Sequence, residues 1–213
     1  DVRLTHKVAQ HLDKEGAKFS SKSKRLENCV RAIVDQQEKN GFTLNLRGAM
    51  LLLSELQEEE DSLVAKATEM FPPKELQLKT KVKYIPFNIA SRKQIAERLM
   101  EKGWEPKHHT DKGNVIVNEE TLSHIKMPEA QMFSRFFLLQ KRTGMLKSWI
   151  KECHDDEKVR GRVMTLKTVT GRMAHNSPNM AQVPASYSPY GKEFRSLWTV
   201  SDPEKYNLIG TDA

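Results

Sequence analysis

The sequence predicts a mainly α-helical protein with a small mixed α+β part toward its end. Apolar residues recur at helical spacing over most of the first two thirds of the chain, and Gly or Pro residues separate these stretches. Beyond residue 160 the pattern changes to short alternating stretches, which favour strands. We therefore expect a boundary in the charged stretch 155–160, in a chain of 213 residues that is long enough for one large domain or two small ones.

Two helices are predicted near the start of the chain. Residues 2–15 place apolar side chains near helical spacing, and Gly16 follows as a stop signal. Residues 25–39 gather apolar side chains on one face and end before Gly41. The basic, Ser-rich stretch 18–25 is expected to join the two helices.

Several longer elements are predicted in the middle of the chain. Asn45 has the residue type of an N-cap for a helix that runs to about Met70 and ends at two prolines. A basic, extended stretch follows, and then a Ser-x-x-Gln capping box opens a helix over 91–102. Pro128 suits the first turn of a further helix that runs to about Arg142 and carries an apolar stripe, which we interpret as core.

The end of the chain is predicted to combine short strands with irregular structure. Residues 161–168 alternate like a strand. Residues 168–191 are too polar for a core and too rich in Pro, Gly and Asn for one regular element. Residues 206–213 have the pattern of a buried strand that carries a carboxylate, Asp212, at its end.

Charge and composition restrict the class of protein. Lys and Arg total 35 against 28 Asp and Glu, and this net charge of +7 favours a polyanionic partner, chiefly nucleic acid or an anionic membrane surface. A generic solubility charge is the other interpretation. The longest apolar runs, such as Met50–Leu53 and Phe136–Leu139, are far shorter than the ~20 residues that span a bilayer, so we expect no membrane partner. Two distant cysteines indicate a reducing compartment, and we expect a cytoplasmic protein, in a bacterial host if the chain is viral.

The sequence contains no recognisable metal-binding motif and none of the common catalytic motifs. The seven histidines are scattered, and the "CHDD" stretch at 153–156 lacks a second pair of ligands at zinc spacing. The sequence has no GxxxxGK[ST], GxGxxG or GxSxG motif. A Ser/His/Asp triad remains an alternative, because the three residues of a triad come together in space and need no fixed spacing in the sequence.

A basic cluster is predicted at the end of the helix that begins at Pro128. Lys141, Arg142 and Lys147 surround Thr143, and such cations bind phosphates while the hydroxyl adds a hydrogen bond. The alternative is that the negative end of a helix dipole favours these cations, without any ligand.

The polar segment 168–191 gives a stronger indication of nucleic-acid binding. Thr170 offers a hydroxyl, the following Gly a close approach of the backbone, and Arg172 a guanidinium. Asn179 and Gln182 add amide groups that reach the N3 and O2 acceptors that every base pair shows in the minor groove. Such contacts sense the shape of a base pair without selecting its sequence. The alternative is an ordinary polar loop.

Several motifs in this part of the chain occur together in one known family. The segments "TGRMAHNSPNMAQVP", "SPYG", "FRSLW" and "GTDA" follow one another between residues 170 and 213. Together they resemble the family A DNA polymerases, and most closely the bacteriophage branch, which is related to bacterial DNA polymerase I. Met180 and Val183 stand where Leu and Ile are usual, and both changes are mild. The earlier segments "PFNIASRKQIAERLMEKGWEPKHHTDKGN" and "LLQKRTGML" are similar to the thumb of the family.

The resemblance implies an organisation for the chain. Residues 1–40 would be a helical segment that follows the 3′–5′ exonuclease domain, residues 41–157 the thumb, and residues 158–213 the start of the palm through its first catalytic Asp. The chain begins without Met and stops at "GTDA", so we expect a fragment. It should not polymerise alone, since the fingers and the second metal-binding carboxylate of the palm are missing.

The resemblance also implies a function and roles for single residues. The family extends a primer 3′-hydroxyl with dNTPs by a two-metal mechanism in DNA replication. The implied partners are primer–template DNA, dNTP and the remainder of the polymerase, and the cofactor is Mg²⁺. Asp212 would ligate both ions and the Ala213 carbonyl one of them, while Arg172 would reach the primer terminus and the incoming nucleotide as a second catalytic residue. The implied DNA contacts are Lys141, Arg142, Thr143, Thr170, Arg172, His175, Asn179, Gln182 and Arg195.

Two further expectations follow from the resemblance. Phage relatives that recruit host thioredoxin carry a long insertion in the thumb, where this chain has only residues 72–86, so we expect no thioredoxin partner. The function class that stays open is a non-catalytic helical DNA-binding module derived from a polymerase. A reading frame that continues past Ala213 into a fingers helix with a Lys-rich face would favour the enzyme.

Overall fold

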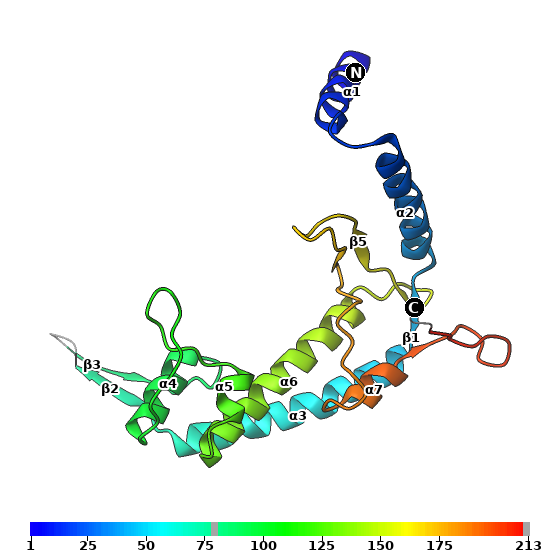
Figure 1. The fold of residues 1–213 in the computed structure, drawn as a ribbon. Helices are drawn as coiled ribbons and strands as arrows, with labels where there is room; N and C mark the ends of the chain where they lie inside the picture. Colours follow the sequence, from blue (N-terminus) through cyan, green and yellow to red (C-terminus); the bar gives the residue numbers. More distant parts are fainter. Residues whose placement is uncertain (78–80, 211–213) are drawn as a thin grey trace. The chain divides into compact units, whose positions relative to one another are not determined.

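The computed structural model describes residues 1–77 and 81–210, and about half of the chain is helical (Figure 1). The mainly helical class predicted from the sequence is therefore confirmed. The chain divides into two compact units: residues 46–151, here called the helical unit, and residues 1–45 with 152–213, here called the terminal unit. Over the described ranges, no helix is both long enough and apolar enough to cross a membrane.

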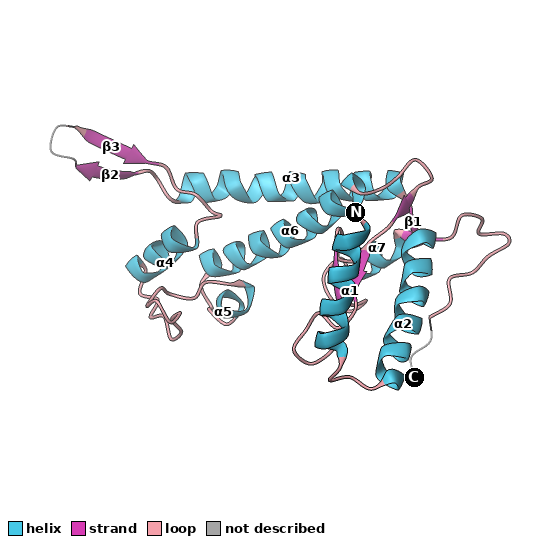
Figure 2. Cartoon of the chain, turned by 90° about the horizontal axis from the view of Figure 1, so that it is seen from above, coloured by secondary structure: helices cyan, strands magenta, loops and turns pink. Residues whose placement is uncertain are grey.

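Two long helices, α3 (Leu46–Met70) and α6 (Pro128–Lys151), lie side by side in the helical unit (Figures 1 and 2). α3 begins directly after Asn45, as the N-cap preference of that residue predicts. It ends just before the Pro72-Pro73 pair, because proline has no N–H with which to continue the helical ladder. Both helices bury Ala and Leu side chains, and α6 also buries Phe and Trp, so packing between helices holds this unit together.

The main hydrophobic core lies where these two helices meet α4 (Arg92–Glu101) and α5 (Glu119–Ser123). Phe71, Phe87 and Phe133 form its aromatic centre, with ring centroids 4.8 to 5.8 Å apart. Such tilted aromatic contacts stabilise a core beyond the area that the rings bury.

Side-chain caps set the starts of the two short helices. The Ser91 hydroxyl accepts the N–H of Gln94 at 3.4 Å, as predicted for α4. The reciprocal bond of the box does not form, because the side-chain oxygen of Gln94 (Oε1) accepts the N–H of Asn88 at 2.7 Å instead. Asn118 and Thr121 form a complete capping box on α5, a helix that the sequence analysis missed.

The basic stretch after α3 is an antiparallel hairpin of β2 (Lys74–Gln77) and β3 (Val82–Ile85). Extended structure was predicted here, but the pairing of the two strands was not. Within the helical unit the hairpin projects beyond the end of α3 (Figure 2). An ion pair between Lys74 and Glu101 ties its base to α4.

The terminal unit begins with α1 (Val2–Gly16) and α2 (Ser21–Asn40). α2 begins four residues earlier than predicted, because the hydroxyl of Ser20 accepts the N–H of Ser23 at 3.1 Å and acts as an N-cap. The predicted joint is correspondingly shorter. Within the described residues α1 buries none of its side chains, and α2 buries only that of Val34.

Short strands complete the terminal unit. One sheet has the order β4-β1-β7, and a second pairs β5 with β6; both are antiparallel. The segment after β6 leads into α7 and then into β7. The bounds are β1 Phe42–Leu44, β4 Lys158–Val159, β5 Arg162–Met164, β6 Ala174–Asn176, α7 Gly191–Ser196 and β7 Trp198–Thr199.

Three further predictions about the elements are wrong. α6 continues nine residues beyond Arg142, since buried Trp149 lies in the added turns and no proline interrupts them. Only residues 162–164 of the alternating stretch 161–168 form a strand, because the chain turns at Leu166 (φ 51°). Residues 206–210 are neither a strand nor buried: in the part that the structure describes, no strand pairs with them, and their apolar side chains stay exposed.

Candidate nucleic-acid interface

The Thr-Gly-Arg segment forms a tight, exposed turn in the terminal unit. The Thr168 hydroxyl accepts the N–H of Arg172 at 2.8 Å and lies 3.0 Å from the hydroxyl of Thr170. Gly171 has φ +76°, a conformation that favours glycine, and the nearest atom to a Cβ built there is 3.9 Å away. The Arg172 guanidinium is exposed and makes no hydrogen bond or ion pair with another described residue. The turn thus presents hydroxyls, an open backbone and a free cation together.

The following Pro-Asn-Met-Ala-Gln segment packs against Gly161. A Cβ on Gly161 would lie 2.3 Å from Cγ of Met180 and 2.8 Å from the carbonyl oxygen of Pro178, so this approach requires glycine. The Asn179 side-chain oxygen accepts the N–H two residues further on at 3.0 Å, which forms a local turn. This turn leaves the NH₂ group of Asn179 as a donor, and Gln182, three residues later in the sequence, is exposed.

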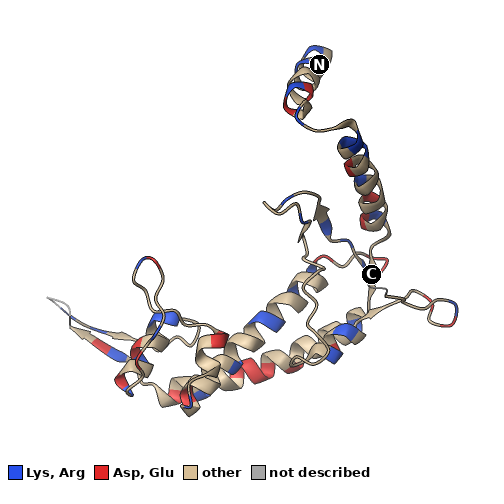
Figure 3. Ribbon diagram, in the orientation of Figure 1, with Lys and Arg blue, Asp and Glu red and all other residues tan. Residues whose placement is uncertain are grey.

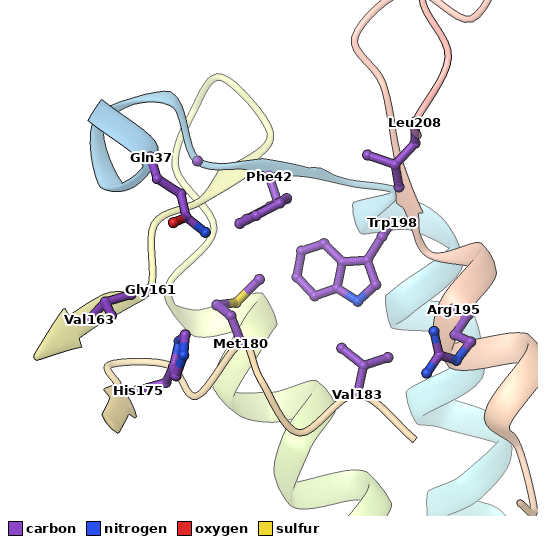
Figure 4. A pocket seen from close by; sticks show the side chains of 11 residues that line it. Gln37, Phe42, Gly161, Val163, His175, Met180, Val183, Arg195, Trp198 and Leu208 are labelled. Atoms are coloured by element: carbon purple, nitrogen blue, oxygen red, sulfur yellow. The ribbon is translucent and has the colours of Figure 1, made fainter. Parts of the chain in front are cut away.

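His175 and Arg195 line one largely apolar cavity of about 360 Å³ in the terminal unit (Figure 4). Strand pairing with Val163 positions His175, and Arg195 donates from Nε to a carbonyl of the preceding loop at 2.9 Å. Trp198 and Phe42 meet edge to face in the lining, with ring centroids 6.5 Å apart. The structure thus brings together two residues that the sequence analysis singled out separately. The remaining lining residues are Gln37, Gly41, Gly161, Val163, Met180, Val183 and Leu208.

An exposed basic stripe runs along α6 in the helical unit (Figure 3). Lys141, Gly144, Lys147 and Lys151 are all exposed, and their spacing places them on one side of the helix. Residues 141–151 contain no Asp or Glu. The helical rise spreads the stripe over roughly 15 Å, so that it can follow several phosphates of a nucleic-acid backbone. The sequence analysis had placed these cations at the end of the helix. In the structure, Lys141 and Lys147 lie within it, because α6 continues to Lys151.

Arg142 and Thr143 lie on the inner side of the same helix. Arg142 is 7% exposed and Thr143 is 3% exposed. Burial lowers the pKa of the Arg142 guanidinium, while the nearby charge of Glu119 acts in the opposite direction. The Thr143 hydroxyl donates to the Glu60 carboxylate at 3.2 Å. In this conformation both side chains serve packing within the unit, and their contact with DNA stays a prediction.

Arg92 is a candidate that the sequence analysis missed. Its guanidinium lies 5.8 Å from the ring centroid of Phe137, and both line a groove of about 620 Å³ together with Lys141. Glu119 and Glu120 face the same groove, so its charge is mixed. The available signal was the position of Arg92 directly after the N-cap Ser91, where an exposed cation gains nothing from the helix dipole.

The predicted metal ligands lie outside the described residues. Asp212 and Ala213 belong to the stretch 211–213, so the structure does not test their proximity to Arg172. Over the described ranges, no three His, Cys, Asp or Glu side chains gather in a way that could hold a metal ion.

Comparison with known proteins identifies the family of this chain. The sequence profile described as DNA polymerase family A matches residues 58–213, which is most of the chain. The chain belongs to the family A DNA polymerases. The expectation drawn from the Thr-Gly-Arg and Pro-Asn-x-Ala-Gln motifs is thus confirmed, together with the likeness to the phage and bacterial branches.

Individual relatives agree with this membership of family A. The chain is 37% identical over 129 residues to the DNA-directed DNA polymerase of Escherichia phage T7, a match that covers 56% of the chain and 18% of the phage protein. It is 30% identical over 132 residues to DNA polymerase I of Helicobacter pylori, which covers 60% of the chain and 14% of that protein.

A solved structure shows the same fold. It is the POL domain of Pol1 from M. smegmatis in complex with DNA primer-template and dNTP, and it aligns with a TM-score of 0.76 at 19% identity. The alignment covers 92% of this chain and 33% of that chain. The present chain thus spans well under half of each of these three polymerase chains.

Proposed function

We propose that this family A chain is part of a DNA-directed DNA polymerase, in which it grips primer–template DNA and supplies one metal-binding carboxylate. The family match over residues 58–213 is the observation that carries this proposal. The polymerase would extend a primer 3′-hydroxyl with dNTPs during DNA replication. We place this activity in the cytoplasm, which for a phage protein is that of the bacterial host.

We assign residues 41–157, which include the whole helical unit, to the thumb. We assign residues 158–213 to the start of the palm and residues 1–40 to the helical segment that follows the exonuclease domain. The side-by-side pair of α3 and α6 favours the thumb assignment, because it provides a stiff support for an exposed basic stripe. The turn at 168–172 favours the palm assignment, because it presents donors suited to a minor groove.

Gly144 gives independent support for DNA along α6. Glycine in the middle of a helix costs about 1 kcal/mol relative to alanine. Among the described residues, nothing lies within 4 Å of a Cβ built on Gly144, so internal packing does not require the glycine. A nucleic-acid backbone that approaches the helix between Lys141 and Lys147 would require it.

The magnesium ligands that we propose for this chain are residues 212 and 213. Asp212 would offer carboxylate oxygens and Ala213 a carbonyl oxygen, which are the ligand types that Mg²⁺ prefers. Bound there, two ions would supply charge stabilisation at the transferred phosphate. The remaining carboxylate ligands would come from the remainder of the polymerase. The part played by the described residues is to hold the primer end, through Arg172 and its turn.

DNA binding by the 213-residue chain tests the gripping role. We expect a fluorescently labelled primer–template duplex to bind with an affinity that falls steeply with salt, because each neutralised phosphate releases roughly 0.9 counterions. Lys141→Ala/Lys147→Ala should flatten the slope of log affinity against log salt by about 2. The matched control Lys66→Ala/Lys126→Ala removes the same charge elsewhere on the helical unit and should leave the slope unchanged. Binding that is insensitive to salt would refute the gripping role.

The catalytic role requires the complete polymerase. There, Asp212→Asn should abolish nucleotide addition while primer–template binding survives. Undiminished incorporation by this variant would overturn the catalytic assignment. A DNA-binding module without catalysis shares the salt dependence, but it predicts no incorporation by any assembly that contains the chain.

A further inference from the structure

The β2–β3 hairpin of the helical unit keeps several large side chains exposed. Leu76, Val82 and Tyr84 are 45%, 47% and 62% exposed. A two-stranded hairpin without a covering layer is marginally stable in water, so one that projects freely gains from an external partner. Its base, in contrast, is fixed: Lys74 pairs with Glu97 and Glu101 on α4.

The two faces of the hairpin differ in charge. Side chains of paired residues lie on the same face, and alternate residues of a strand share that face. The pairs Lys74–Ile85 and Leu76–Lys83 therefore form one face. The same alternation, extended back by one residue, puts the exposed Lys81 on it too. We call this the lysine face. The opposite face carries Glu75, Gln77, Val82 and Tyr84.

The lysine face continues onto the start of α4. Lys74 and Ile85 line a cavity of about 240 Å³ together with Lys93 and Arg98, while Glu97 is the acidic residue in the lining. Lys81 and Lys83 make no hydrogen bond or ion pair with another residue in the described part of the chain. On an extended strand the Cα atoms of Lys81 and Lys83 lie about 7 Å apart. These two unpaired lysines thus follow a base that itself carries Lys74, Lys93 and Arg98.

We propose that the lysine face of the β2–β3 hairpin binds the sugar–phosphate backbone of duplex DNA. The positive charge of the lysine face favours a polyanion as its ligand. Because the chain belongs to the family A DNA polymerases, we take this polyanion to be DNA. Contacts from lysines to phosphates carry no sequence information, so this grip holds DNA of any sequence. The inference rests on the proposed DNA binding by the chain and adds a second contact to that of the α6 stripe.

The test compares salt dependence of duplex binding across variants of the 213-residue chain. Lys81→Ala/Lys83→Ala should weaken binding and flatten the slope of log affinity against log salt by about 2. The charge-reversing variant Lys81→Glu/Lys83→Glu should weaken binding further. Lys66→Ala/Lys126→Ala, with the same loss of charge, and Tyr84→Ala on the opposite face should bind as the unaltered chain does. Circular dichroism of each variant checks that the fold is retained.

The outcomes separate this inference from the proposed function. If Lys141→Ala/Lys147→Ala flattens the slope and Lys81→Ala/Lys83→Ala does not, the hairpin contact is overturned and the α6 grip stands. If the unaltered chain shows no salt-dependent binding, both are overturned. If the hairpin variants instead dissociate an oligomer in sedimentation velocity while duplex binding stays unchanged, the face joins two copies of the chain and the DNA contact is rejected.

Discussion

The carboxylate of Glu38 on α2 accepts a 2.6 Å hydrogen bond from the backbone N–H of Val163 on β5. Seven residues earlier on the same helix, Arg31 donates to the carbonyl oxygen of Val163 at 2.7 Å, and Arg31 and Glu38 also pair with each other at 2.9 Å. Two side chains of a helix thus satisfy both backbone groups of one buried strand residue. This arrangement fixes β5, and through its pairing partner β6 it fixes one end of the polar segment that follows.

Glu38→Ala should destabilise the terminal unit. The buried N–H of Val163 would lose its partner, and an unsatisfied buried donor costs about 1–3 kcal/mol. Asp35→Ala is the control: Asp35 pairs with Arg31 one turn further along the same helix, and ion pairs that water screens contribute little to stability. Urea unfolding followed by Trp fluorescence measures both. If both variants lost the same free energy of unfolding, the hydrogen bond from Val163 to Glu38 would contribute no more to stability than the ion pair of Asp35.

Two glycines should respond in opposite ways to alanine. Gly161→Ala places a Cβ in the space of Met180 and should cost about 1–3 kcal/mol through overpacking. Gly144→Ala meets open space in α6 and should stabilise the helical unit by roughly 0.5–1 kcal/mol. If DNA approaches α6 as proposed, the Gly144 variant binds duplex more weakly although it is more stable. Urea unfolding and anisotropy on the same samples check this pair, and tighter binding by Gly144→Ala would contradict the close approach.

The sequence predicted most helices of this chain because their signals are local. Ser91 and Asn45 mark the starts of α4 and α3 by the hydrogen-bonding capacity of one side chain. The end of α6 was missed because a basic cluster near Arg142 resembles a helix C-terminus, while what extends the helix is burial of Trp149, a tertiary effect. Residues 206–210 have a strand pattern without a strand beside them among the described residues, and pairing is not local.

Some features of the candidate site depend on local sequence, and others depend on contacts between distant segments. The Thr-Gly-Arg segment could be singled out from its residue types alone, and the hydrogen bonds of its turn join residues at most four apart. The cavity shared by His175 and Arg195 could not, since its lining comes from segments as distant as Gln37 and Leu208. Nor does residue type alone separate Lys141, which is exposed, from its neighbour Arg142, which is buried.

Lys141 and Arg142 should therefore behave differently when each is changed to alanine. Lys141→Ala should weaken duplex binding, flatten the salt slope by about 0.9, and leave stability within about 0.5 kcal/mol. Arg142→Ala should lower the unfolding free energy, because it removes a buried side chain that faces Glu119. Anisotropy titrations and urea unfolding of the two variants give the comparison. A salt slope that falls for Arg142→Ala with unchanged stability would place that guanidinium on DNA instead.

Acid should loosen the junction between the end of α2 and the strands of the terminal unit. Arg160 donates to both carboxylate oxygens of Asp156, and from Nε to the carbonyl oxygen of Lys39 at 3.0 Å. The hydrogen bonds from Arg160 lower the pKa of Asp156 from 3.8 to about 2. Because the folded-state pKa is depressed, the stabilisation is present above the ordinary pKa and is lost as the pH falls from about 4 to about 2.

Asp156→Asn removes the titrating group, so the variant should be less stable than the unaltered chain at pH 5 and should lose less on acidification. Asp155→Asn is the matched control, since Asp155 is an exposed neighbour with no hydrogen bond or ion pair to another described residue. Urea midpoints measured from pH 5 down to about 2 give the comparison. Parallel curves for Asp156→Asn and the unaltered chain across this range would mean that the pair with Arg160 does not hold the junction, and that Arg160 anchors α2 through the Lys39 carbonyl alone.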